Sequence, residues 1–327
     1  MPELAFVIFD EEQRGRLGLI AKSGLFKTYI GTFLFHRFKW KKFKNGIHVF
    51  KIEVDTNILL IKLPFQLAML SILNRKYLER YISRVYSAAG CKKCFVPSDA
   101  RKLGGFEQYS TDANSRSVVF KALLLPILNE IYLKSGLRLD NLDMAFVNGE
   151  NSAELLTMVK QLEPYVKYIT VASSEKEAVE DVLSDICADS GICIFVGSDI
   201  KNILRNAELI INLGKAAEIS RYRIRPSSLV VNYSCESNTV LKGEYTAIMG
   251  VEYTFQRGMY DMLGEDIQRS FSREELTEIL MAFKTGLLYG GSYNDATATL
   301  ILDIYINCRC SITGFNGRRG VLRVENV

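Results

Sequence analysis

The sequence predicts an α/β protein whose central part is a doubly wound parallel sheet. Two features of residues 137–254 carry this prediction: short apolar runs alternate with helical segments, and the runs contain few polar residues. Such continuous apolar runs are typical of strands that helices cover on both faces. Right-handed connections would then place helices on either side of the sheet. The five expected strands are residues 144–148, 168–172, 192–196, 209–213 and 229–232.

Segments with helical spacing separate these runs. We expect helices at residues 152–162 and 175–188 and a short helix at residues 200–206. The connection between the fourth and fifth strands is a short helical or irregular piece. Five strands joined in this way form one domain, which we place at residues 137–254.

Residues 1–114 predict a separate α/β domain. The dipeptide Asn45-Gly46 between two strand-like runs is a strong signal for a hairpin. A polar, glycine-containing stretch at residues 101–114 is expected to be a loop. The other expected elements are a strand-like run at 25–35, strands at 5–9, 47–54, 58–63 and 93–96, and a helix at 66–89 that Gly90 ends.

Residues 115–136 predict a connecting helix, because apolar residues recur at three- and four-residue intervals and Gly136 ends the pattern. Residues 255–327 are expected to be a helical segment that packs back on the N-terminal domain. Within it, Ser272 and Glu275 form a capping box at the start of a helix over residues 272–288. Residues 297–308 fit a helix or a strand, and residues 314–320, with Arg318 and Arg319, fit a turn.

The composition is that of a globular chain: 48% of residues are hydrophobic and 24% are charged. The net charge of +4 is local, because residues 1–50 hold nine Lys and Arg against four Asp and Glu. The first residues lack a basic start followed by an apolar run, and Lys62, Pro64 and Gln66 interrupt the most apolar stretch. We therefore expect a cytoplasmic protein with no membrane span. Seven scattered cysteines fit reduced thiols.

The turn after the first strand of the central domain is the candidate phosphate site. A dinucleotide-binding fold has G-x-G-x-x-G here, so that the backbone can approach the pyrophosphate. In this sequence Gly149 fits, whereas Asn151 and Glu154 stand where the second and third glycines would be, and Glu150 adds a negative charge. The helix start still offers N–H groups and the hydroxyl of Ser152. Two hypotheses stay open: a modified but working site, or a fold whose site is lost.

The end of the second strand bears on the choice of cofactor. An acidic residue there would bind the ribose 2′-hydroxyl of NAD, but this chain has Ser173, Ser174 and Lys176. Two hydroxyls and a cation suit a 2′-phosphate, so we expect NADP rather than NAD. The alternative is that one serine caps the helix, with Glu177 nearby.

Two further glycines complete the expected cofactor site. Gly214 follows the fourth strand, and Gly250 follows the last. Both would lie beyond the carboxyl ends of the strands, where ligands bind in such sheets. Glu252 and Tyr253, just after Gly250, would face the nicotinamide ring.

The order of parts resembles the shikimate dehydrogenase and glutamyl-tRNA reductase group, which has a substrate domain, a connecting helix, a Rossmann domain and returning helices. The segment Tyr109-Ser110-Thr111-Asp112, before the helix with Lys121-Ala122-Leu123, resembles the Asn-Thr-Asp segment of shikimate dehydrogenases. The resemblance implies an NADP-dependent oxidoreductase that acts on a small carbonyl or hydroxy substrate in the cleft between domains. It also implies Asp112 as a catalytic residue, with Lys102, from the segment at residues 96–102, as its partner.

Alternatives and other partners remain in view. The main alternative is a non-catalytic protein of the same fold that binds a small ligand or a protein partner. Cys91 and Cys94 form a C-x-x-C in which a redox role competes with incidental thiols. The basic, aromatic stretch at residues 36–44 fits an exposed hairpin face better than a nucleic-acid site. We expect a small-molecule substrate, a homodimer, no membrane and no nucleic acid.

Overall fold

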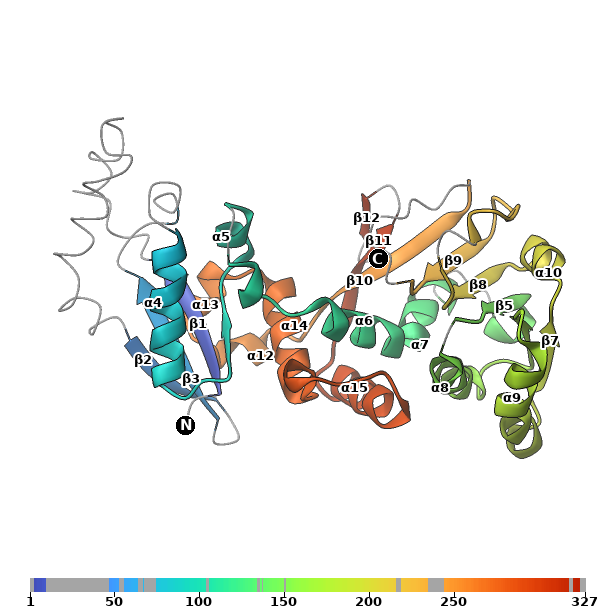
Figure 1. Ribbon diagram of the computed structural model, residues 1–327, viewed down its shortest axis with the longest axis horizontal. Coiled ribbons are helices and arrows are strands. Elements are labelled where there is room, and N and C mark those ends of the chain that lie inside the picture. The colour runs from blue at the N-terminus through green and yellow to red at the C-terminus, as the bar shows by residue number, and fades with distance from the viewer. Residues whose placement is uncertain are drawn as a thin grey trace. The chain divides into compact units, whose positions relative to one another are not determined.

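A computed structural model describes residues 3–9, 47–52, 56–63, 67, 75–103, 106–133, 136, 138–149, 151–215, 219–234, 244–317 and 320–323. The chain divides into two compact units (Figure 1). Unit 1 holds residues 1–112 and 256–280, and unit 2 holds residues 113–255 and 281–327. Several expected features lie outside the described residues: the run at 25–35, the basic stretch at 36–44, the Asn45-Gly46 turn, Glu150, Arg318 and Arg319.

The described part of unit 1 contains a four-stranded sheet in the order β2-β3-β1-β4. Strand β1 is parallel to β3 and β4, while β2 is antiparallel to β3. Every residue of β1 is buried, so this apolar strand forms the centre of the unit's core. The strands are β1 (Leu4–Phe9), β2 (Ile47–Ile52), β3 (Thr56–Leu63) and β4 (Lys93–Phe95), close to the ranges that the sequence predicts.

Helices complete unit 1 around this sheet. Helix α4 (Arg75–Ala88) covers the sequence-predicted helix in its described part, and Gly90 follows it with a φ of 76°. The expected loop at residues 101–114 is wrong in part, because it contains the end of α5 (Ser98–Lys102) and the 3-10 turn η3 (Glu107–Tyr109). From the C-terminal part come α12 (Gly258–Asp261), α13 (Glu265–Ser270) and the start of α14 (Arg273–Lys284).

Unit 2 contains a sheet of eight strands in the order β12-β11-β10-β9-β8-β5-β6-β7. Its first six strands along the chain are all parallel, and counted from β5 their spatial order is 3-2-1-4-5-6. That order is the one of the Rossmann fold, and it confirms the predicted doubly wound parallel sheet. The strands are β5 (Met144–Val147), β6 (Tyr168–Ala172), β7 (Cys193–Gly197), β8 (Leu209–Asn212), β9 (Leu229–Asn232) and β10 (Thr246–Thr254).

Two strands follow β10 in the sheet and differ from the expectation. β11 (Ser311–Gly317) and β12 (Gly320–Arg323) form an antiparallel pair, and β11 is antiparallel to β10. The turn expected at residues 314–320 is therefore wrong in part, because residues 314–317 and 320 belong to strands, and the C-terminal segment expected to be helical also contains these two strands. The backbone groups of β10 on this side are satisfied by β11, so the sheet continues beyond the six parallel strands.

The helices of unit 2 include α8 (Ser152–Leu162), α9 (Lys176–Ser190) and α10 (Ile200–Asn206), in agreement with the sequence. Short turns are η5 (Leu139–Asn141) and η6 (Leu287–Tyr289). Residues 295–307 are helical: α15 (Asp295–Asn307) begins at Asn294, whose side chain accepts a hydrogen bond from the N–H of Thr297. Lys160 of α8 pairs with Asp295 at 2.7 Å.

The long connecting helix expected at residues 115–136 is interrupted. The structure has α6 (Ala113–Ala122), α7 (Leu124–Leu128) and a π turn, η4 (Asn129–Leu133). Pro126 explains the break, because proline has no N–H to donate to Ala122 four residues earlier and its ring crowds that carbonyl. Within the described residues, no helix is long and apolar enough to cross a membrane.

Candidate functional site

The carboxyl ends of the parallel strands of unit 2 meet at one edge of the sheet, and the strand order reverses between β5 and β8. Val147, the last residue of β5, is level with Asn212, the last of β8, and Asn212 is level with Asn232, the last of β9. Ligands of doubly wound sheets bind at such a reversal, beyond the carboxyl ends of the strands. This edge of the sheet is therefore the place to look for a site.

The loops after β5 and β8 touch through two glycines. A Cβ on Gly149 would lie 2.4 Å from the carbonyl oxygen of Leu213, and one on Gly214 would lie 3.1 Å from that of Asn148. The first distance is impossible for a real side chain, so glycine is required at position 149 by backbone packing. Gly149 and Gly214 thus follow β5 and β8 as the sequence predicts. They allow the two loops to come into close contact.

Asn151 caps helix α8. Its side-chain oxygen accepts a hydrogen bond from the N–H of Ala153 at 3.1 Å, and its carbonyl accepts from the N–H of Glu154. Ser152, the first helical residue, is partly exposed beside it. Two N–H groups at the start of α8 are therefore bonded within the turn, and fewer are left for a phosphate than a glycine-rich turn would offer.

Glu154, in the place of the third glycine, forms an ion pair. Its carboxylate lies 2.5 Å from the ammonium of Lys121, and the two side chains are 23% and 9% exposed. The ammonium also lies 5.9 Å from the centre of the Tyr293 ring. The negative charge of Glu154 is thus compensated by a lysine from α6.

Polar side chains at the ends of the strands leave buried atoms without hydrogen-bond partners. The Asn212 amide donates to Asn232 at 2.6 Å and its oxygen accepts from the N–H of Gly214 at 3.0 Å. Among the described residues, the unpartnered atoms at this edge are Asn232 Nδ2, Asn148 Oδ1 and the hydroxyl of Tyr233. Each such atom costs about 1–3 kcal/mol when nothing replaces water, so the edge offers donors and an acceptor that the fold does not use.

Tyr233 lies just beyond β9 and is 4% exposed. Burial raises the pKa of its hydroxyl well above the ordinary value, so Tyr233 stays protonated and can donate a hydrogen bond. Its ring contacts that of Phe120, with the ring centres 4.5 Å apart. The ring is therefore held in place while its hydroxyl lacks a partner among the described residues.

The end of β6 carries the residues that the sequence assigns to a 2′-phosphate. Ser173 is buried, and its hydroxyl accepts a hydrogen bond from the N–H of Glu175 at 3.1 Å, which shapes the turn before α9. Ser174 and Lys176 are exposed, and the lysine lies 3.4 Å from Glu180 one turn along. Of the three, Ser173 is thus used by the fold, whereas Ser174 and Lys176 face outward.

Gly250, Glu252 and Tyr253 lie inside strand β10 rather than after the last strand. Gly250 faces Asn316 of β11, whose amide nitrogen would be 3.2 Å from an added Cβ. Glu252 and Tyr253 pair with β11 on either side of a register shift, and Tyr253 is buried. The expectation that they follow the sheet is wrong, because β10 extends to Thr254 through its pairing with β11.

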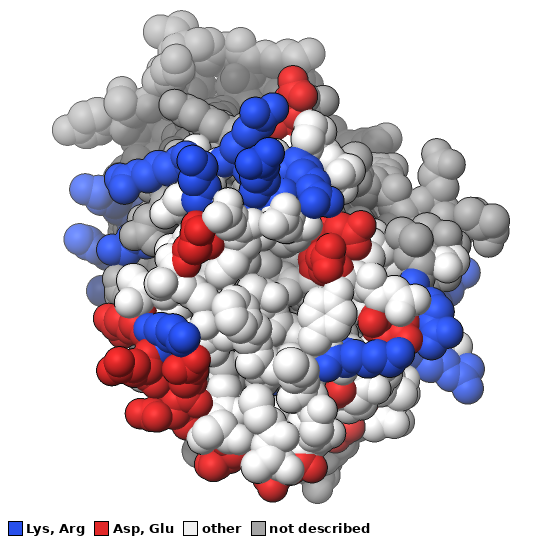
Figure 2. Space-filling model, turned by 90° about the vertical axis from the view of Figure 1, so that its right-hand side faces the viewer, with Lys and Arg blue, Asp and Glu red and all other residues white. Residues whose placement is uncertain are grey.

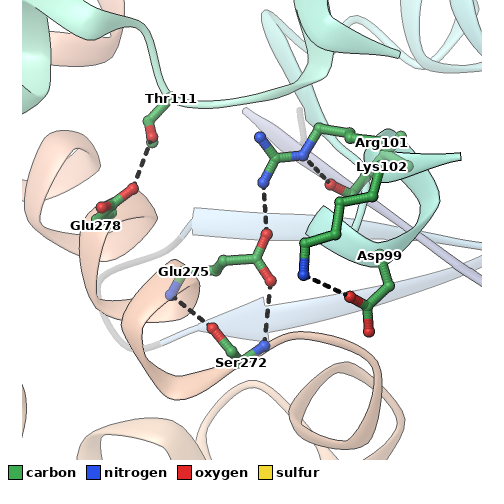
Figure 3. A network of polar contacts seen from close by, with 8 residues as sticks. Asp99, Arg101, Lys102, Thr111, Ser272, Glu275 and Glu278 are labelled. Carbon is green, nitrogen blue, oxygen red and sulfur yellow. Dashed lines mark hydrogen bonds and ion pairs between the residues drawn. The ribbon is translucent and has the colours of Figure 1, made fainter. Parts of the chain in front are cut away.

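The residues expected to be catalytic, Asp112 and Lys102, belong to unit 1, and Figure 3 shows the surroundings of Lys102. The ammonium of Lys102, at the end of α5, lies 3.0 Å from the carboxylate of Asp99, and both side chains are more than two-thirds exposed. Asp112 is exposed and directly precedes α6. Lys102 thus pairs with Asp99, three residues earlier, instead of with Asp112.

A polar network lies next to Lys102 and ties α14 to the rest of unit 1 (Figure 3). Arg101 pairs with Glu275 at 2.5 Å, and Thr111 donates to Glu278 at 3.0 Å. Ser272 and Glu275 exchange two hydrogen bonds of 3.2 Å, which confirms the predicted capping box. These contacts are structural ties rather than an arrangement of groups around a substrate.

Cys91 and Cys94 are both buried in the core of unit 1. Burial raises the pKa of the Cys91 thiol to about 11 and raises that of Cys94 further. A thiol of this kind forms little thiolate at neutral pH, so neither residue suits redox or nucleophilic chemistry. Among the described residues, no group of three or more His, Cys, Asp or Glu could hold a metal ion.

The polar strand ends are visible in the sequence as asparagines that directly follow apolar runs. Three strands of unit 2 run into an asparagine: Val147-Asn148, Ile211-Asn212 and Val231-Asn232. Lys121 and its pairing with Glu154 had no such signal, because the two residues are 33 positions apart on different helices.

No protein-family model matches the sequence, and no curated protein matches it. Among solved structures, the chain is similar to Δ1-pyrroline-2-carboxylate reductase of Thermococcus litoralis in complex with NADH and L-proline, with 10% identity, a TM-score of 0.25, and coverage of 36% of this chain and 35% of that chain. It is similar to L-tryptophan dehydrogenase of Nostoc punctiforme, with 12% identity, a TM-score of 0.30, and coverage of 94% and 89%. It is also similar to shikimate dehydrogenase of Mycobacterium tuberculosis, with 11% identity, a TM-score of 0.30, and coverage of 92% and 98%.

Proposed function

We propose that unit 2 binds a nicotinamide dinucleotide of the NADP type at the carboxyl edge of its sheet, and that the protein is an oxidoreductase. The strand order 3-2-1-4-5-6 carries the proposal, because dinucleotides bind beyond the carboxyl ends of the strands where the order of such a sheet reverses, here between β5 and β8. The unpartnered polar atoms of Asn148, Asn232 and Tyr233 at the same edge support it independently. A bound nucleotide would supply the partners that these atoms lack.

The residues present fit such a group in part. Gly149 and Gly214 carry no side chain where the loops after β5 and β8 meet, and Ser152 stands at the helix start. Asn151, in contrast, bonds to an N–H that a phosphate would use. The pyrophosphate would therefore be held by the Ser152 hydroxyl, the remaining backbone N–H groups and the positive end of α8.

The choice of NADP rests on the end of β6. Ser174 and Lys176 are exposed there, and the pair between Lys176 and Glu180 involves two side chains that are each 48% exposed. Such a pair is worth about 0–1 kcal/mol, so a 2′-phosphate can take the lysine from the glutamate. A phosphate dianion binds an ammonium more strongly than an exposed carboxylate does.

Bound NADPH supplies a hydride for the reduction of a carbonyl, and the protein supplies orientation and a proton. We propose Asp112 and Lys102 for the second task on a small carbonyl or hydroxy substrate. Both side chains are exposed, and the Lys102–Asp99 pair is weak for the same reason as above. One group would hold the carbonyl oxygen while the other relays the proton to it.

A second function is favoured by specific observations. Asn151 occupies part of the phosphate-binding turn, and Lys102 pairs with Asp99 rather than with Asp112. A non-catalytic protein of the same fold would tolerate both features, and would bind a small ligand or a protein partner. Its ligand would use the same unpartnered atoms at the sheet edge.

Calorimetric titration with NADPH and NADH tests the proposal. We expect NADPH to bind more tightly, and Lys176→Ala to weaken NADPH binding about tenfold, equivalent to about 1.4 kcal/mol, without changing NADH binding. Ser174→Asp is expected to shift the preference toward NADH. Lys167→Ala is the matched control, because this exposed lysine precedes the opposite end of the same strand. If neither nucleotide binds at millimolar concentration, the oxidoreductase proposal fails.

A further inference from the structure

A groove in unit 1 has the size of a small-molecule site. Its volume is about 570 Å³, and such sites in proteins measure about 300–1,000 Å³. The described residues that line it come from α4 and η3, and all of them belong to unit 1. None of them lies at the sheet edge of unit 2, so the groove is a separate place to look for a ligand.

Three of the side chains that line the groove are cationic and lie on one face of α4. Lys76, Arg80 and Arg84 follow one another at four-residue intervals, which places them about 6 Å apart along the helix. All three are exposed, and among the described residues no acidic side chain forms an ion pair with any of them. Like charges at this spacing repel one another and destabilise a helix. An anion in the groove would remove this repulsion.

The carboxylate among the described lining residues is held by the fold. The side chain of Glu79 accepts a hydrogen bond from the N–H of Phe106 at 3.0 Å, and its backbone carbonyl accepts one from the hydroxyl of Tyr109 at 3.2 Å. Phe106 and Tyr109 are buried, and their ring centres lie 6.1 Å apart. Glu79 thus fixes η3 against α4, and three cations against one carboxylate leave the lining with a surplus of positive charge.

We infer that this groove binds a small ligand that carries two or more phosphate groups. Arginine presents a planar fork of N–H donors that matches phosphate oxygens, and two arginines and a lysine line the groove. A phosphate group carries up to two negative charges, so two such groups can neutralise three cations, whereas a single carboxylate cannot. The Ser83 hydroxyl and the Gln108 amide also line the groove and can donate to further oxygens. The inference does not depend on the nucleotide proposed for unit 2.

The extent of the cationic cluster favours a small ligand over a nucleic acid. Interfaces with nucleic acids cover about 1,000–2,500 Å² of protein surface and draw on cations that are spread across it. The three cations of the groove lie within two turns of one helix, a length of about 12 Å. A cluster of this length suits a ligand with a few phosphate groups.

A second group of basic residues provides a matched control. Figure 2 shows basic residues in its upper part, on the side of unit 2 where Figure 1 places α10. Replacing two arginines of this group changes the net charge as much as replacing two arginines of the groove does, so it separates a specific site from a general effect of charge. The exposed basic residues of α10 and the following connection, none of which is among the described residues that line the groove, are Lys201, Arg205, Arg221, Arg223 and Arg225.

Calorimetric titration of the full chain with inorganic triphosphate, at a constant ionic strength of about 0.15 M, tests this inference. We expect triphosphate to bind at the groove. Arg80→Gln with Arg84→Gln is expected to raise its dissociation constant at least about tenfold, because each replaced arginine takes away charge-assisted hydrogen bonds. Arg221→Gln with Arg223→Gln is expected to change the dissociation constant less than about twofold, because a distant exposed charge is screened at this ionic strength.

Further measurements separate the class of ligand and the state of the fold. Arg80→Gln with Arg84→Gln is not expected to lower the midpoint of thermal unfolding without ligand, because it removes repulsion between like charges. Citrate and a short DNA duplex are expected to bind at least about tenfold more weakly than triphosphate. No binding of triphosphate at about 1 mM overturns the inference. So does an equal loss of binding in the two double variants, or a duplex that binds more tightly than triphosphate and loses its binding when the groove arginines are replaced.

Discussion

Replacement of Gly149 by alanine tests the geometry of the sheet edge. The new methyl carbon would lie 2.4 Å from the carbonyl oxygen of Leu213, and contacts under 3.0 Å are essentially never found. The loops after β5 and β8 must therefore separate by roughly 0.6 Å, although each is fixed to a buried strand. Overpacking of this kind costs about 1–3 kcal/mol. We expect a loss of about 2 kcal/mol, because both contact atoms are backbone and cannot rotate away.

Urea unfolding followed by far-ultraviolet circular dichroism measures this loss, with two glycines as controls. At Gly197 the added carbon would meet the ends of the Ile203 and Phe195 side chains at 2.9 and 3.0 Å, and these can move, so Gly197→Ala is expected to cost less. Gly258 has nothing within 4 Å, so Gly258→Ala is expected to be neutral or stabilising. If Gly149→Ala is as stable as the wild type, the two loops do not meet as described.

Three other predictions follow from contacts already described. Lys121→Met is expected to lower the free energy of unfolding in urea by about 2 kcal/mol, because it leaves the Glu154 carboxylate half-buried and unpaired. Adding Glu154→Gln should recover more than half of this loss. Equal losses in the single and double variants would contradict the prediction. At pH 8 a thiol reagent should modify exposed Cys193 about 100-fold faster than Cys94, whose pKa burial raises, as followed by peptide mass spectrometry; similar rates would contradict the burial. Asp295→Asn should cost under about 1 kcal/mol at pH 7. The hydrogen bond from Lys160 lowers the pKa of Asp295 below 3.8. The stabilisation is therefore present above that pH and is lost as the pH falls through the lowered pKa. A difference in the free energy of unfolding between the wild type and Asp295→Asn that persists near about pH 2 would refute the assignment.

The strands of unit 2 could be predicted from the sequence because each is a continuous apolar run. The five apolar runs lie within one or two residues of β5 to β9, since buried parallel strands need apolar side chains on both faces. The capping box of Ser272 and Glu275 could be predicted as well, because the two residues that exchange its hydrogen bonds are three positions apart. Interactions of this kind can be predicted because the interacting residues are neighbours in the sequence.

Contacts between segments that are distant in the sequence could not be predicted in the same way. Residues 249–252 of strand β10 are all partly buried, so the segment lacks the alternation of a half-buried strand, and it forms a strand through its pairing with β9 and β11. The pair of Lys121 with Glu154 joins two helices, and neither residue by itself indicates a partner. Pro126, by contrast, was a visible signal for the break after α6, and the helical periodicity around it outweighed that signal.

Amide hydrogen exchange with and without NADPH tests most directly whether the edge between β5 and β8 holds the nucleotide. We predict that saturating NADPH slows exchange in residues 151–155, at the start of α8, and in residues 213–215, while the capped first turn of α14 in unit 1 is unchanged. Unchanged exchange in both segments of unit 2 at saturation, or slowing confined to unit 1, would contradict the proposed site.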